Sequence, residues 1–134
     1  MPPLVQDVQI SGLGQGLGIE NTANVQTLHV LVEHASLADL TREGIVVTHA
    51  ANRTLGTAII DLGGGPLGSE GRNRFVHNGA FDVSVTNNMT TAPIEVFASE
   101  NFWGGGAPVI GTDVSLSDNV AFTAPTFLTT DPAP

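Results

Sequence analysis

The stretch Arg74–Thr86, RFVHNGAFDVSVT, carries the clearest structural signal in this chain of 134 residues. Phe81, Val83 and Val85 alternate with polar residues, which is the period-2 pattern of a half-buried strand. Asn78-Gly79 lies between this run and the preceding apolar residues, and Asn-Gly readily adopts the positive φ angles of a type I′ turn. The stretch therefore predicts a β-hairpin.

The same alternation recurs outward from this stretch in both directions. It predicts strands over residues 94–99 and 113–117, and further strands near residues 4–10, 25–33, 44–50, 57–62, 73–77 and 119–123. Eight or nine short strands are typical of an all-β domain, so we expect a single-domain antiparallel β-sandwich or barrel.

Two other local patterns qualify this prediction. Ser36–Gly44 predicts one short helix, with Ser36 as N-cap and Gly44 as stop. Ala-Pro recurs at Ala92, Ala107 and Ala124, but intervals of fifteen and seventeen residues do not predict a solenoid. We expect residues 1–18 to form an N-terminal arm with a glycine-rich linker, residues 19–123 the sandwich body, and residues 124–134 a proline-rich tail.

The composition predicts a weakly charged, acidic surface. The chain has no Lys, Cys or Tyr, thirteen acidic residues against four Arg, and a formal net charge of −9. Charged residues make up 13% of the chain, against about 25% in a typical domain, and such a surface suits permanent contact with neighbours. The acidic balance argues against nucleic acid and anionic membranes as partners, and no run of transmembrane length occurs. We therefore expect a soluble chain.

The spacing of the residues gives little support to several candidate binding and catalytic sites. The glycines of Gly12–Gly18 fit neither nucleotide-binding loop, and Ser69 does not lie in a nucleophile elbow. His29, Glu33 and His34 are metal-ligand types, but strand geometry keeps His29 away from the other two. A zinc site that folding assembles with the distant His49 and His77 remains an alternative. A calcium site at Asp113–Asn119 also remains an alternative.

No nucleophile, base and orienting group occur together, so we predict a protein that is not an enzyme and needs no cofactor. The remaining enzymatic alternative is glycoside hydrolysis by Asp82 and Glu95, if the two carboxylates approach each other across adjacent strands.

Two features are candidate partner contacts. Arg72 and Arg74 would share a strand face, where they either contact an acidic partner or pair with the chain's own carboxylates. Phe102 and the single Trp103 lie in the loop Asn101–Gly106. Trp103 is predicted to lie at an interface, to cap the core, or to stack on a sugar.

The Pro-flanked segment Pro2–Gly18, the pair of strands around Phe75–Phe81 and the apolar segment Phe122–Leu128 give the chain a general resemblance to the decoration, or cement, proteins of tailed bacteriophage heads. The resemblance implies a structural protein that binds the outer surface of a virus capsid and stabilises the shell. It also implies that the major capsid protein is the partner and that the chain is a homo-oligomer, with a trimer favoured, which is soluble before assembly.

The N-terminal segment would add a strand to a coat-protein sheet, with Leu4, Val5, Val8 and Ile10 as contacts. The alternative functions are a carbohydrate-binding or adhesin-like sandwich, with Trp103 stacking on the sugar and Asn101 donating hydrogen bonds, or a tail or fibre component of a virion.

Overall fold

The computed structural model describes residues 4–6, 9–12, 16–21, 25–49, 55–87 and 93–132. All regular elements in these ranges are β-strands, and all their pairings are parallel. The predicted antiparallel sandwich or barrel is therefore wrong. The predicted helix is also wrong, because Ser36–Leu40 forms strand β5.

The strands form three parallel sheets, which we call sheets A, B and C. Sheet A contains, in order, β1 (Leu4–Gln6), β4 (Val25–Glu33), β7 (Leu55–Gly63), β10 (Ile94–Ala98) and β12 (Val120–Thr123). Sheet B contains β2 (Gln9–Gly12), β5 (Ser36–Leu40) and β8 (Arg74–Val76). Sheet C contains β3 (Leu17–Asn21), β6 (Ile45–His49), β9 (Val83–Asn87) and β11 (Val114–Leu116).

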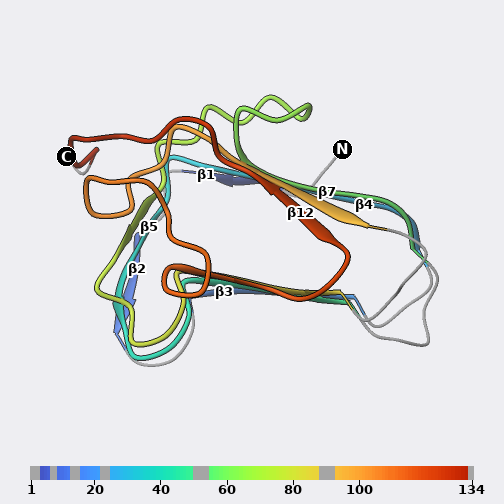
Figure 1. Cartoon of the computed structure of the whole chain (residues 1–134), viewed down its shortest axis with the longest axis horizontal. Helices are drawn as coiled ribbons and strands as arrows, with labels where there is room; N and C mark the ends of the chain where they lie inside the picture. The colour runs from blue at the N-terminus through green and yellow to red at the C-terminus, as the bar shows by residue number, and fades with distance from the viewer. Residues whose placement is uncertain are drawn as a thin grey trace.

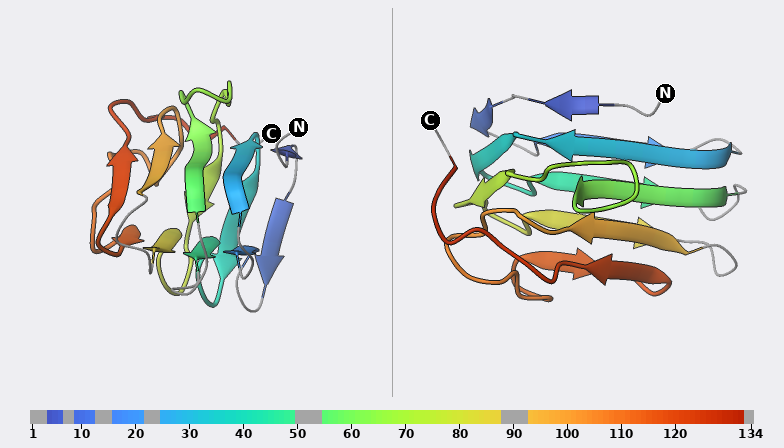
Figure 2. Two further views of the ribbon diagram at one scale, coloured as in Figure 1. Left: turned by 90° about the vertical axis from the view of Figure 1, so that its right-hand side faces the viewer. Right: turned by 90° about the horizontal axis from the view of Figure 1, so that it is seen from above.

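The chain passes through sheets A, B and C in turn and then returns to sheet A, which is the path of a parallel β-helix. Figure 1 shows the three sheets as the sides of a flattened triangle, and Figure 2 shows the strands stacked from β1 to β12. We call one passage through the three sheets a coil. The strands of sheet A begin at residues 4, 25, 55, 94 and 120. Because the connecting loops differ in length, this solenoid has no fixed sequence period, and its rejection from the Ala-Pro spacing was wrong.

The core lies inside the triangle and is built from columns of equivalent residues. In sheet A, Val30 pairs with Ile60, and Ile60 pairs with Val96. In sheet C, Ile45, Val83 and Val114 form a similar column, and all six residues are at most 3% exposed. Along β6, β9 and β10 buried residues alternate with more exposed ones, so the prediction of half-buried strands is confirmed there.

Asn78-Gly79 does not form the predicted hairpin. Neither residue has a positive φ, and the flanking strands β8 and β9 belong to different sheets. The Asn78 side chain instead donates to Leu37 O and accepts from Leu40 N in the preceding coil. A Cβ on Gly79 would lie 2.2 Å from Thr41 O, so the glycine permits close stacking of two coils.

The corner between sheets A and B repeats the same backbone conformation in three coils. His34, Arg72 and Glu100 have φ values of 52°, 58° and 59°, the left-handed region that non-glycine residues rarely adopt. Each is followed by a buried residue, namely Ala35, Asn73 and Asn101. The corner is therefore a structural repeat, although its sequence varies.

The buried asparagines hold this corner together across coils. Asn73 Nδ2 lies within hydrogen-bond distance of Val32 O, Leu62 O and Asn101 Oδ1, at 3.1, 2.9 and 3.0 Å. Its Oδ1 accepts from Ala35 N, and Asn101 Nδ2 donates to Leu62 O and Ala98 O. These bonds satisfy backbone groups that the turn leaves out of the sheet ladders.

The predicted arm and tail also contain described residues. Strands β1, β2 and β3 pair with β4, β5 and β6 of the next coil. Beyond β12, Phe127 bridges to Asn101 and Asp131 pairs with Arg74. The described ranges include no helix long and apolar enough to span a membrane.

Candidate functional site

The candidate site is a pocket on the corner between sheets B and C. It has a volume of about 310 Å³, at the lower end of the range for small-molecule sites. Its walls come from three successive segments of two coils: Val76, His77, Asn78, Ala80, Asp82, Trp103, Gly104, Thr112 and Asp113. We call it the corner pocket.

Two carboxylates from neighbouring coils meet in the corner pocket. Asp82 directly precedes β9 and Asp113 directly precedes β11, and the first residues of these strands, Val83 and Val114, are paired. The Asp82 amide donates to Asp113 O at 2.7 Å. Parallel stacking therefore places two acidic side chains at equivalent positions of adjacent coils.

Burial sets the ionisation of the first of these carboxylates. The pKa of Asp82 is raised from 3.8 to about 6, because desolvation and the charge of Asp113 together outweigh a hydrogen bond from Asn78 that lowers it. That bond runs from Asn78 Nδ2 to Asp82 Oδ1 at 2.9 Å. Asp113 Oδ2 accepts from Val109 N at 2.8 Å, which fixes the second carboxylate. At neutral pH the Asp82 carboxyl group is therefore ionised for most of the time.

Trp103 contributes the apolar part of the pocket. Its indole stacks on Phe75 with ring centroids 4.7 Å apart and an interplanar angle of 25°. The residue is 8% exposed, and its Nε1 is buried without a hydrogen-bond partner. The prediction that Trp103 caps the core is confirmed, and its ring is largely covered by protein. A buried N–H without an acceptor costs about 1–3 kcal/mol.

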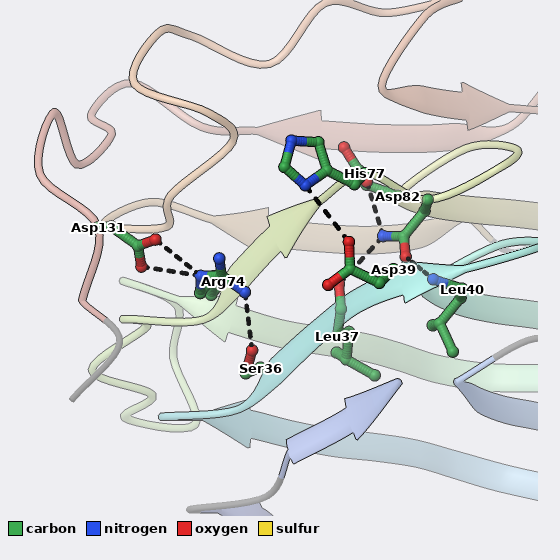
Figure 3. A network of polar contacts seen from close by, with 9 residues as sticks. Ser36, Leu37, Asp39, Leu40, Arg74, His77, Asp82 and Asp131 are labelled. Atoms are coloured by element: carbon green, nitrogen blue, oxygen red, sulfur yellow. Dashed lines mark hydrogen bonds and ion pairs between the residues drawn. The ribbon is translucent and has the colours of Figure 1, made fainter. Parts of the chain in front are cut away.

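An ion pair lies beside the corner pocket, and Figure 3 shows it between His77 and Asp39, close to Asp82. His77 Nδ1 lies 3.4 Å from Asp39 Oδ1, and both side chains are mostly exposed. Asp39 and His77 have φ values of 57°, because they turn the chain at equivalent points of adjacent coils. His77 therefore lies on the solvent side of the site.

The alternative in which Asp82 approaches Glu95 for glycoside hydrolysis is wrong. Glu95 is exposed on β10 of sheet A, whereas Asp82 lies between sheets B and C. Ser69 has a structural role, since its Oγ donates to Val32 O at 2.8 Å and accepts from Gly71 N. Asn101, the predicted sugar donor, is fully buried, and its amide is bonded to backbone carbonyls.

The predicted partner contacts lie in several places. Leu4 and Val5 are in β1, Ile10 is in β2, and Val8 lies outside the described residues. Phe102 is half-buried and bridges to Arg74 in sheet B.

Arg72 and Arg74 do not share a strand face, because Arg72 lies in the left-handed corner before β8. Arg74 Nε bonds both oxygens of Asp131 at 2.9 and 2.8 Å, and its Nη1 reaches Ser36 Oγ (Figure 3). For Arg74, pairing with the chain's own carboxylates is confirmed.

The other sequence candidates are also distributed over the coils. Asp113 and Asp118 lie at opposite ends of β11, so they do not form a compact calcium loop. Gly16 is closely packed, since a Cβ there would lie 2.6 Å from Gly44 O. Glu33 and His34 do come together, but with Glu70 and without His29, and His49 is enclosed in sheet C.

The sequence pointed to Asp82 and Trp103 individually but not to their proximity. Two similar segments of the sequence could have indicated how the coils align, namely Asn73-Arg74-Phe75 and Asn101-Phe102-Trp103. In each, an Asn precedes an aromatic residue by two positions. Aligning them aligns the two coils and brings Phe75 against Trp103.

Comparisons of the chain with protein-family models, with curated proteins and with solved structures give no match.

Proposed function

We propose that this protein binds a carbohydrate in the corner pocket and does not transform it. The observation that carries the proposal is that the Asp82 and Asp113 side chains line one pocket together with Trp103. Such a pocket suits a ligand that donates several hydrogen bonds to carboxylates, and adjacent sugar hydroxyls do this.

The charge of the pocket narrows the class of sugar. Two carboxylates on a chain of net charge −9 repel uronic and sialic acids. A neutral or amino sugar matches them, since its hydroxyl or ammonium groups donate to carboxylate oxygens. The volume of about 310 Å³ favours recognition of one terminal residue over a long chain segment.

The first test is a glycan array that contains neutral, amino and acidic sugars, followed by titration of the best ligand by calorimetry. Asp113→Asn should weaken binding roughly ten- to hundredfold, the expected loss for a hydrogen bond to a charged group. Asp118→Asn is the matched control, because Asp118 is exposed at the far end of β11, and it should leave the affinity unchanged.

Binding confined to acidic glycans would contradict the proposal, and so would equal affinities for wild type and Asp113→Asn. Release of a shortened sugar during the titration would contradict the non-enzymatic part.

Binding to the outer surface of a virus capsid, with the major capsid protein as partner, stays a prediction from the sequence. One observation favours a role in assembly: Val109, Ile110 and Phe127 are large apolar residues with exposures of 54%, 55% and 36%. Exposed apolar side chains of this size occur where protein surfaces meet, although single ones are common.

A further inference from the structure

A group of metal-ligand types forms at the corner between sheets A and B, away from the corner pocket. Glu33 ends β4, His34 turns the corner, and Glu70 lies in the loop 64–73 between β7 and β8. One ligand atom from each of the three residues lies within 4.8 Å of the other two. No other such group of three occurs among the described residues.

The backbone holds these residues in place. Asp61 is fully buried, and its two oxygens accept four amide hydrogens from Gly63, Gly65, Leu67 and Ser69. The loop then follows β4, since Glu70 N donates to Glu33 Oε1 at 3.2 Å and His34 N donates to Gly71 O at 2.8 Å. The group is therefore ordered by main-chain contacts, independently of any bound ion.

The surroundings of the His34 imidazole supply an independent observation at this group. His34 Nε2 is a buried atom without a hydrogen-bond partner, although part of its ring is exposed. It lies 3.7 Å from Glu70 Oε1, which is too long for a hydrogen bond. Two ligands of a tetrahedral ion with bonds of about 2.1 Å are separated by about 3.4 Å, so the spacing fits a shared metal.

We propose that Glu33, His34 and Glu70 bind one zinc ion or a similar divalent transition metal. The imidazole nitrogen favours such an ion over calcium, which takes oxygen ligands. Two carboxylates neutralise the charge of the ion, and water completes the coordination.

The bound metal would join β4 to the loop 64–73. That loop carries Asn73 into the buried asparagine pair, so the metal would strengthen the stacking of two coils. Its expected effect is on stability, which separates this site from sugar binding in the corner pocket.

The test is calorimetric titration of chelator-treated protein with zinc chloride, with thermal unfolding as a second readout. Wild type should bind one zinc ion and melt at a higher temperature when zinc is present. His34→Gln and Glu70→Gln should each weaken binding by at least about tenfold and remove the thermal shift. Both changes affect partly exposed side chains, so the fold should persist, which circular dichroism without zinc will check.

His77→Gln is the matched control. His77 also pairs with a carboxylate, that of Asp39, but the two belong to no group of three ligands among the described residues. This variant should bind zinc like wild type. Absence of saturable zinc binding to wild type, or equal affinities for wild type and a folded His34→Gln variant, would overturn the proposal. So would an equal loss in His77→Gln.

Discussion

At the scale of the residue, burial of Asp82 makes the stability of the protein depend on pH. The folded-state pKa of about 6 exceeds the ordinary value of 3.8, so the folded state binds the proton more tightly than the unfolded state. The contribution of Asp82 to stability is therefore complete below about pH 4 and is lost as the pH rises through 6. Ionised Asp82 destabilises the fold at neutral pH.

Asp82→Asn should remove this dependence. An amide keeps the acceptor for Asn78 and carries no charge, so the variant should match wild type near pH 4. Near pH 8 it should be more stable by about 1–2 kcal/mol, which allows for water that reaches the pocket. Urea unfolding across this pH range gives the difference, with Asp118→Asn as control. A constant difference between Asp82→Asn and wild type would contradict the assignment.

At the scale of the element, the corner between sheets A and B is stabilised by side chains more than by regular strand pairing. In sheet B, strand β8 is only three residues long. Beyond β8 the pairing consists of isolated bridges at Phe102 and Phe127. Asn73 and Asn101 supply the hydrogen bonds that the short strands lack. The left-handed residues before them, such as Arg72 and Glu100, repeat the turn.

Asn73→Ala should destabilise the protein by roughly 3 kcal/mol, because Ala35 N loses its side-chain acceptor in a buried site and the bonds from Asn73 Nδ2 to three buried oxygens are lost. That is a large part of the stability of an ordinary domain. Glu95→Gln, on the exposed face of β10, should change the free energy of unfolding by less than about 0.5 kcal/mol. Chemical denaturation of the two variants compares them directly. Equal free energies of unfolding would refute a structural role for Asn73.

At the scale of the whole molecule, stacked coils leave strand edges at the ends of the sheets. Among the described strands, β12 pairs only with β10, and β11 pairs only with β9. An unpaired edge offers amide and carbonyl groups to another chain, and exposed Val109 and Ile110 precede β11. The homo-oligomer that the resemblance implies stays a prediction, and these edges and apolar side chains are where we would place the contact between copies.

Light scattering over a wide concentration range measures the oligomeric state. We expect three times the chain mass of 13.8 kDa, and Ile110→Asp should lower this mass by placing a charge in the contact. Thr130→Ala, at another exposed position, should leave it unchanged. A mass of one chain at all concentrations would exclude the trimer.

The sequence was sufficient to locate most strands, since alternation over residues 25–33 and 94–99 matches β4 and β10 closely. Alternation reports that one face of a strand is buried, and that face is the same in a sandwich and in a coil. It contains no information on the neighbouring strand, so antiparallel pairing could not be distinguished from parallel pairing. The candidate site could not be predicted for the same reason, because which residue lies beside Asp82 depends on which strands stack.

The sequence by itself determined an all-β, acidic chain with strands near their observed positions, because side-chain polarity and local backbone preferences act over a few residues. Only the tertiary structure decided that Asn78 and Gly79 join two coils, that Asp82 meets Asp113, and that Glu33 and His34 meet Glu70. These contacts arise from stacking of coils, in which residues about 30 to 40 positions apart pack at the spacing of neighbouring strands.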